Sequence, residues 1–102
     1  MMLYLFSAQC YLMLGEKEAA NREFEKAVDA ERGNGYAMLR WARNSYSLAI
    51  ERRAEGEQSY SVYAQTAQHM ALRAMQYDAG NSDAKDILHR LANEFPEIVE
   101  RE

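Results

Sequence analysis

Small and apolar residues recur three or four positions apart through most of the chain, with polar and charged residues between them. The first part of this pattern comprises Tyr4, Ala8, Tyr11, Ala20, Phe24 and Ala27. Such spacing is typical of α-helices that bury one face, and no segment has the strict apolar and polar alternation of a β-strand. The pattern therefore predicts an all-α fold.

Glycine and proline mark where these helices end. Glycines stand at positions 15, 33, 35, 56 and 80, and the only proline is Pro96. Because both residue types interrupt helices, we expect five helices, with Ser82 and Asp83 capping the last one. The expected helices span residues 2–14, 16–31, 36–54, 58–78 and 82–95.

Stripes of alanine indicate how the helices pair. The third and fourth helices carry a stripe made of Met38, Trp41, Ala42, Ser45, Leu48, Ala49, Tyr60, Tyr63, Ala64, Ala67, Ala71 and Ala74. Alanine lets neighbouring helix axes approach, and larger residues opposite, such as Phe24 and Trp41, fill the remaining space. The last helix has a similar stripe, made of Ala84, Leu88, Ala92 and Phe95. We therefore expect successive antiparallel hairpins.

Length and charge limit the classes of function. A chain of 102 residues is expected to form one domain. Its 12 Lys and Arg residues against 16 Asp and Glu residues give a net charge of −4, with the two signs interspersed. Nucleic acid and anionic membranes are therefore not expected partners. The apolar start of the chain lacks a basic leader and is too short to span a bilayer, so we expect a buried helix and no membrane insertion.

The chain offers few candidates for chemistry. Cys10 is the only cysteine, so no internal disulfide can form and no metal-ligand spacing is present; a reducing, cytoplasmic location is expected. His69 and His89 lie on different expected helices, with no Ser, Cys or acidic residue at a triad spacing. We therefore expect no catalytic residues, no metal and no cofactor. An enzyme would require the fold to bring one of these histidines beside Cys10.

Residues 1–34 resemble one unit of the tetratricopeptide repeat family, whose period is 34 residues. The matching positions are Tyr4, Ala8, Tyr11, Leu14, Gly15, Ala20, Phe24 and Ala27. Ser7 and Arg32 depart from the family's Leu and Pro without removing the packing pattern. The resemblance covers nearly the whole chain as two and a half repeats, and it implies a short right-handed α-solenoid of stacked antiparallel hairpins.

The second unit is longer than the family's repeat. Gly15 and Ala20 are five residues apart, whereas the corresponding Ala49 and Ala67 are eighteen apart. The additional residues would extend each helix by about two turns, or about 10 Å beyond the neighbouring hairpin. The expected seam of this extension consists of Ile50, Ala54, Tyr60 and Tyr63. The resulting units are a repeat over 1–34, an extended repeat over 35–81, a capping helix over 82–95 and a tail over 96–102.

The resemblance also implies a binding groove along the first helix of each hairpin. The residues at the corresponding places are Met2, Leu5, Phe6, Gln9, Leu12, Met13, Tyr36, Leu39, Arg40, Arg43, Tyr46 and Ser47. Leu5 and Gln9 stand where chaperone-binding members carry the Lys and Asn of a carboxylate clamp, so that clamp is not predicted. We expect a protein or peptide partner with apolar anchors and a carboxylate near Arg40 and Arg43.

Other interpretations of the same residues stay open. The apolar side chains of the first helix could pack against a preceding helix, or against a second copy in a homodimer. A chaperone-like binder of secretion substrates would use a similar groove. Arg40 and Arg43 could simply form a solvated face. Tyr60 and Tyr63, near the tip of the extended hairpin, suit either packing there or contact with a partner.

Overall fold

The computed structural model describes residues 2–32 and 34–99, and these residues form six helices and no strand. The helices are α1 (Met2–Met13), α2 (Lys17–Ala30), α3 (Gly35–Ala54), α4 (Tyr60–Tyr77), α5 (Ser82–Glu94) and α6 (Pro96–Val99). The predicted all-α class is confirmed. The expected count of five helices was wrong, because part of the expected tail forms the short α6.

Asparagine side chains start α3 and α5. The Oδ1 atom of Asn34 accepts a hydrogen bond from the backbone N–H of Ala37 at 3.0 Å, and that of Asn81 accepts one from the N–H three residues later at 2.9 Å. Each bond satisfies one of the unpaired N–H groups at a helix start. The expected cap at Ser82 and Asp83 is therefore wrong, since Asn81 takes that role and α5 begins at Ser82.

α1 and α3 end in the same kind of glycine turn. Gly15 and Gly56 both have a φ of +78°, a left-handed conformation that glycine adopts without strain. In each turn the glycine N–H donates to the carbonyl three residues earlier at 3.0 Å, and the next N–H donates to the carbonyl five residues earlier at 2.9 Å. The two helices therefore lead into α2 and α4 through closely similar backbone geometry.

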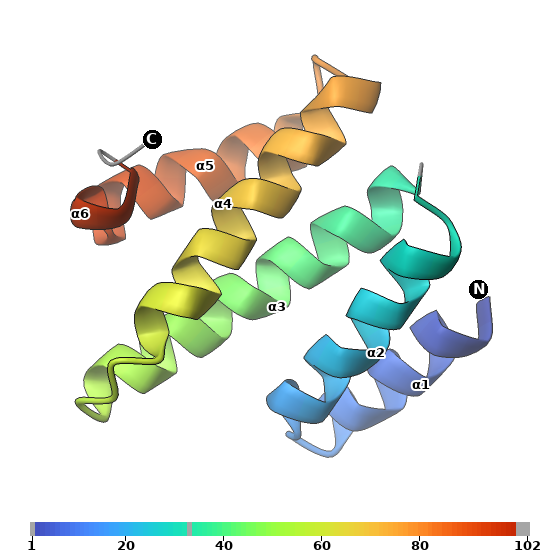
Figure 1. The fold of residues 1–102 in the computed structure, drawn as a ribbon, viewed down its shortest axis with the longest axis horizontal. Coiled ribbons are helices and arrows are strands. Elements are labelled where there is room, and N and C mark those ends of the chain that lie inside the picture. The colour runs from blue at the N-terminus through green and yellow to red at the C-terminus, as the bar shows by residue number, and fades with distance from the viewer. Residues whose placement is uncertain (1, 33, 100–102) are drawn as a thin grey trace.

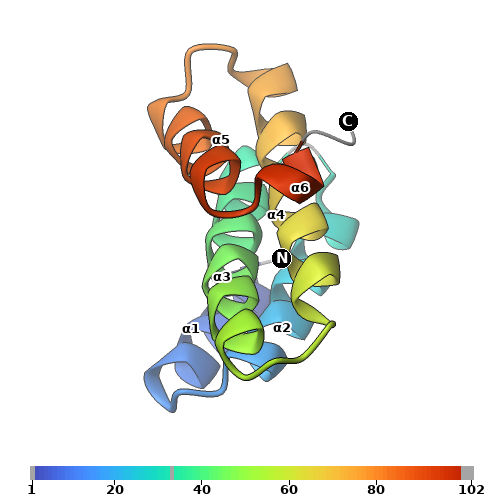
Figure 2. The same cartoon turned by 90° about the vertical axis from the view of Figure 1, so that its left-hand side faces the viewer.

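The helices form two layers. α1 pairs with α2 and α3 pairs with α4 as antiparallel hairpins, and the two hairpins meet through α2 and α3 (Figure 1). α5 packs on α3 and α4, and α6 packs on α4 and α5. Figure 2 shows α1, α3 and α5 on one side of the molecule and α2 and α4 on the other. One side of the molecule is thus built from the first helix of each hairpin together with α5.

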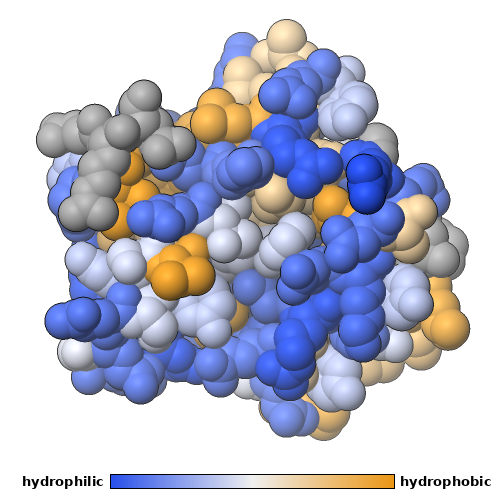
Figure 3. All heavy atoms as spheres, in the orientation of Figure 1, coloured by the Kyte–Doolittle hydropathy of each residue, from blue (hydrophilic) through white to orange (hydrophobic). Residues whose placement is uncertain are grey.

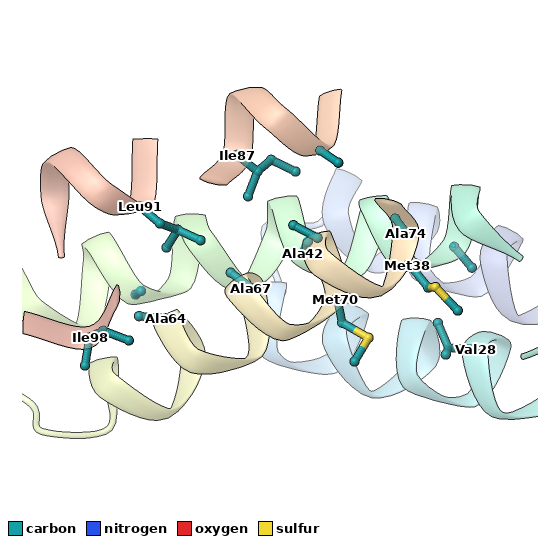
Figure 4. Close-up of a cluster of buried hydrophobic side chains, with 14 of the residues drawn as sticks. Val28, Met38, Ala42, Ala64, Ala67, Met70, Ala74, Ile87, Leu91 and Ile98 are labelled. Carbon is teal, nitrogen blue, oxygen red and sulfur yellow. The ribbon is translucent and has the colours of Figure 1, made fainter. Parts of the chain in front are cut away.

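Alanine makes up much of the core. The buried alanines are Ala8, Ala20, Ala27, Ala37, Ala42, Ala49, Ala64, Ala67, Ala71, Ala74 and Ala84. Figure 4 shows Ala42 of α3 and Ala67 of α4 among larger side chains such as Met70 and Leu91. Small residues on facing helices allow close approach, and larger residues fill the space around them. The predicted combination of small and large residues in the core is confirmed.

The buried face of α5 differs from the predicted one. Ala84 is buried as expected, but Leu88 is only half-buried and Ala92 is exposed. Ile87 and Leu91 take the inner positions, with exposures of 3% and 0%. Both sets of residues have helical spacing, but burying an isoleucine and a leucine removes more apolar surface from water than burying a leucine and an alanine. α5 is therefore rotated about its axis relative to the prediction.

A polar cluster lies inside the contact between α2 and α3. Asn44, only 6% exposed, donates to the backbone carbonyl of Lys17 and to Oδ1 of Asn21, both at 2.9 Å. Asn21 in turn donates to Oγ of the buried Ser45 at 3.0 Å. Across the described part of the chain, no buried side-chain nitrogen or oxygen lacks a hydrogen-bond partner. These directional bonds fix how the first hairpin is placed against the second.

The end of the second hairpin, around Gly56, is attached to α5. The Arg53 guanidinium lies over the Phe95 ring, 4.4 Å from its centroid. It also donates to the backbone carbonyl of Glu94 at 2.6 Å and to the Glu94 carboxylate at 2.8 Å. Tyr60 meets the Phe95 ring edge-on, with centroids 5.8 Å apart. This end of the second hairpin is therefore held against the C-terminal helices.

The opposite side of the same hairpin end is attached to α2. Glu18 forms an ion pair with Arg52 at 3.0 Å and accepts a hydrogen bond from the Tyr63 hydroxyl at 3.2 Å. Lys17 pairs with Glu51 close by. Of the residues expected in the seam of the extension, Ala54 is exposed, whereas the other three are half-buried. The sequence did not indicate that α2 and the C-terminal helices both contact this end of the second hairpin.

Candidate partner-binding face

The open side of the layer made by α1, α3 and α5 carries many of the predicted groove residues. We call it the α1/α3/α5 face. Its residues on α3 are Tyr36, Arg40, Arg43 and Ser47. They are four, three and four positions apart, so they share one side of the helix. Tyr36 is 59% exposed, as is the Arg43 side chain. The middle of this face is therefore polar and cationic.

Arg40 is held in place between α1 and α3. Its guanidinium donates to Oε1 of Gln9 at 2.6 Å and to the Tyr36 hydroxyl at 2.7 Å. It also lies over the rings of Phe24 and Tyr36, 5.4 and 5.6 Å from their centroids. The predicted groove residues Gln9, Tyr36 and Arg40 therefore meet in the structure. A cation that is already positioned loses less side-chain freedom when it binds an anion.

A cleft of about 330 Å³ lies between α3 and α5. It is lined by Arg43, Tyr46, Asp86, Ile87 and Arg90. Arg90 pairs with Asp86 at 2.9 Å, and Arg43 pairs with Asp83 at 3.5 Å. The side chains of both pairs are more than half exposed, and ion pairs of this kind contribute little stability. A carboxylate from a ligand can therefore replace either aspartate at modest cost.

Tyr46 supplies a neutral hydroxyl to this cleft. Burial raises the pKa of Tyr46 above its ordinary value of 10.0, and the nearby Glu94 carboxylate raises it further, against the opposing effect of Arg90. The hydroxyl therefore stays protonated at neutral pH. It can donate a hydrogen bond to a carboxylate held by the arginines.

α1 adds an apolar part to the same face. Phe6 and Met13 are 69% and 77% exposed. They lie three positions before and four positions after Gln9, which places all three side chains on one side of α1. Because Gln9 reaches Arg40, this side of α1 adjoins the cationic part of the face.

Other predicted groove residues are turned further inward. Leu5, Leu12, Leu39 and Tyr46 are partly buried and pack against the core, although Tyr46 still lines the cleft. The side chain of Met2 lies outside what the structure describes. Only some of the residues predicted to line the groove are therefore exposed at the surface.

Residues of α5 complete the face, although the sequence pattern does not predict them as groove residues. Asp83, Asp86 and Arg90 are three and four positions apart, along one side of α5. This spacing is a usable signal, but charged residues at helical spacing usually form only a solvated face. Their closeness to Arg43 depends on how α5 packs on α3, which the local pattern does not contain.

α1 also exposes apolar residues beyond the groove. Leu3 is 72% exposed and Cys10 is exposed as well, and Leu14, directly after α1, is 71% exposed. None of the 12 residues of α1 is charged. Figure 3 shows apolar atoms along the edge where Figure 1 places α1, whereas most of the visible surface is hydrophilic. The sequence predicts an apolar, buried first helix, and in the structure only one side of it is buried.

The residues considered for catalysis lie on separate elements. Cys10 is on α1, His69 on α4 and His89 on α5, and all three are exposed. Figure 2 places α1 and α5 at opposite ends of their layer, with α3 between them. Within residues 2–32 and 34–99, no group of three or more His, Cys, Asp or Glu residues could hold a metal ion. Among the helices described here, none has the length and apolar character needed to cross a membrane.

The chain matches no protein-family model, no curated protein and no solved structure.

Proposed function

We propose that this chain is a protein-interaction module of the tetratricopeptide type. The hairpins α1–α2 and α3–α4 would be consecutive repeats of a short right-handed α-solenoid, and α5 would be the capping helix. The repeat-like spacing over residues 1–34 supports this proposal. So does the layer of α1, α3 and α5, because the first helices of repeats in such an array line one common face.

The ligand would be a peptide or helix of another protein that carries both a carboxylate and apolar side chains. The observation that carries this proposal is the position of Arg40, which Gln9 and Tyr36 hold between α1 and α3. Arginine binds carboxylates through two parallel hydrogen bonds. Arg43 and Tyr46 add a second cation and a hydroxyl along the same helix.

The apolar anchors of the ligand would pack on Phe6 and Met13. Large exposed apolar side chains beside a polar rim are typical of peptide-binding surfaces. A chaperone-like role, in which the apolar part alone captures secretion substrates, is a narrower alternative based on the same two residues. The net charge of −4 favours a protein ligand over nucleic acid, and the single free cysteine suits a reducing, cytoplasmic location.

Selection from a library of random short peptides tests the proposal. We expect the selected peptides to combine large apolar residues with Asp, Glu or a terminal carboxylate. Fluorescence anisotropy with one such peptide should show binding that weakens by about tenfold or more in Arg40→Ala. Arg22→Ala removes an exposed arginine of α2 and is the matched control, expected to bind normally.

The same experiment separates the alternatives. Purely apolar peptides that bind Arg40→Ala and the native protein equally well would favour the chaperone-like role. If no peptide is enriched, or if Arg22→Ala weakens binding as much as Arg40→Ala does, the α1/α3/α5 face is not the binding site.

A further inference from the structure

A second exposed line of residues runs along α1 and is almost wholly apolar. We call it the α1 stripe, and it consists of Leu3, Phe6, Cys10 and Met13. The exposures of Leu3, Phe6 and Met13 are 72%, 69% and 77%, and Cys10 is exposed. Helices that are apolar on all sides are normally buried on all sides. We therefore expect another protein surface to cover the stripe.

The spacing of the stripe is symmetric. Its residues are separated by three, four and three positions, so the order of gaps is the same from either end. A second α1 helix lying antiparallel would therefore present the same gaps in register. Phe6 would then face the partner's Cys10, and Leu3 would face the partner's Met13.

The sizes and charges along the stripe also suit self-pairing. The bulky ring of Phe6 would lie opposite the small thiol side chain of the partner's Cys10. Because the interface is two-fold symmetric, the same contact forms twice. α1 has no charged residue, so two copies meet there without repulsion between like charges, although each chain has a net charge of −4.

We infer that two copies of this chain associate through the α1 stripe, with α1 antiparallel to its counterpart and the two-fold axis between Phe6 and Cys10. A helix of 12 residues is about 18 Å long, so the interface belongs to the small class, below about 1,200 Å². Such interfaces are weak and reversible. We expect dimerisation at tens to hundreds of micromolar protein, on the order of a Kd of 10⁻⁵ to 10⁻⁴ M.

The dimer and the proposed peptide ligand would compete. Phe6 and Met13 belong both to the α1 stripe and to the α1/α3/α5 face, so a second copy and a peptide cannot both cover them. The competition rests on the proposed peptide site, whereas the dimer does not. By linkage, a peptide that binds only the monomer lowers the apparent dimer affinity.

Sedimentation velocity over a wide concentration range tests the dimer without any peptide. We expect a shift from monomer to dimer for the native chain and for Val62→Glu, a control at an apolar residue of α4 that is 61% exposed. Phe6→Glu should remain monomeric at every concentration, with its helix content unchanged in circular dichroism. A monomeric native chain at the highest concentration, or a dimer that persists in Phe6→Glu, would overturn the inference.

Thiol crosslinking tests the antiparallel register. Phe6→Cys places a thiol opposite the partner's Cys10, so mild oxidation or a short bismaleimide should give a covalent dimer rapidly. The native chain, in which Cys10 faces a phenylalanine, and Val62→Cys should crosslink at least about fivefold more slowly. Equal rates in the three proteins would overturn the proposed register.

Adding a selected peptide tests the competition. We expect the peptide to dissociate the native dimer at concentrations that saturate the monomer. Bound peptide on an intact dimer would remove the competition and leave the dimer established. A failure of peptide selection would affect the proposed function alone, because dimerisation is measured on the protein by itself.

Discussion

Single alanines determine how closely the helices of this molecule approach each other. Ala67 has no exposed surface, and it lies between α3 and α4 among Ala42, Met70 and Leu91 (Figure 4). A side chain at this position has no free space to enter without moving α4 away from α3. A buried alanine of this kind limits the distance between two helix axes, whereas an exposed alanine such as Ala92 does not.

Replacing Ala67 with leucine should therefore overpack the second hairpin. We expect Ala67→Leu to lower the free energy of unfolding by about 1–3 kcal/mol, because neighbouring side chains must leave their preferred rotamers. Urea denaturation followed by circular dichroism measures the change. Ala92→Leu makes the same substitution on an exposed side of α5 and should change stability by no more than about 0.5 kcal/mol. Equal effects at the two sites would show that packing around Ala67 is loose.

Asn44 makes a different contribution, through hydrogen bonds rather than packing. In Asn44→Ala the backbone carbonyl of Lys17 and the side chain of Asn21 each lose a donor. We expect a loss of about 1–3 kcal/mol, since buried polar atoms left unpaired pay the cost of desolvation. The exposed Asn93 of α5 provides the control, and Asn93→Ala should be nearly neutral in the same urea titrations. A neutral Asn44→Ala would mean that water replaces the lost donor.

The sequence predicts some of these residues and not others. Ala67 and Phe24 follow from helical spacing, since each lies on a stripe that has only one possible buried side. Ile87 and Leu91 do not, because the neighbouring stripe through Leu88 fits the helical period equally well. The pairing of Asn44 with Asn21 depends on the contact between two hairpins, and no local pattern contains that contact.

At the scale of elements, α5 and α6 hold the end of the second hairpin. Phe95 is fully buried at the junction of α5 and α6, where it contacts the Arg53 guanidinium and the Tyr46 and Tyr60 rings. Each contact is modest, and together they join the C-terminal helices to α3 and α4. α5 and α6 thus also support the end of the second hairpin, whose helices are longer than those of the first hairpin.

Removing this ring should loosen the C-terminal helices. We expect Phe95→Ala to cost about 3–5 kcal/mol, the usual range for truncating a buried phenylalanine. Hydrogen exchange should show faster exchange in α5 and near Gly56, with α1 and α2 much less affected. Phe6→Ala truncates an exposed phenylalanine and should leave the stability of the monomer within about 0.5 kcal/mol. A uniform increase in exchange along the chain would instead indicate that the molecule unfolds as one unit.

Helix positions were the most predictable feature, because glycines lie between the apolar stripes. α6 was missed for an identifiable reason. Pro96 predicts the end of the preceding helix, yet proline is also favoured as the first residue of a helix, and α6 begins at Pro96. The Gln9 to Arg40 contact could not be predicted, since it requires the relative placement of α1 and α3.

At the scale of the whole molecule, two tyrosines link the second hairpin to its neighbours. The Tyr63 hydroxyl donates to Glu18 of α2 at 3.2 Å. Tyr46 lies beside Phe95 and near Glu94, the last residue of α5. Burial is the main cause that raises the pKa of both tyrosines above 10.0, followed by the carboxylates of Glu18 and Glu94. The folded state therefore favours the neutral form of each.

Stability should accordingly fall in alkaline solution. Because the folded pKa values lie above the ordinary value of 10.0, the unfolded chain loses these protons first as the pH rises. The stabilisation is complete below pH 10 and is lost as the pH passes through the raised values. We expect the double variant Tyr46→Phe with Tyr63→Phe to lose less stability above pH 10 than the native chain does, in urea titrations at a series of pH values. Tyr77→Phe, at an exposed tyrosine, should follow the native chain; a double variant that does so too would contradict this account.

The glycine turns at the ends of α1 and α3 have a consequence for engineering. Gly56 follows Gly15 by 41 positions, which is seven more than the 34-residue period of the repeat family proposed above. Seven residues make nearly two whole turns at about 3.6 residues per turn, so the longer helix reaches its turn pointing in almost the same direction as the shorter one. The second hairpin can therefore be lengthened or shortened in steps of seven residues per helix. The ends of α3 and α4 that lie away from the Gly56 turn then keep their orientation. An epitope grafted at this turn could thus be moved outward in steps of about 10 Å.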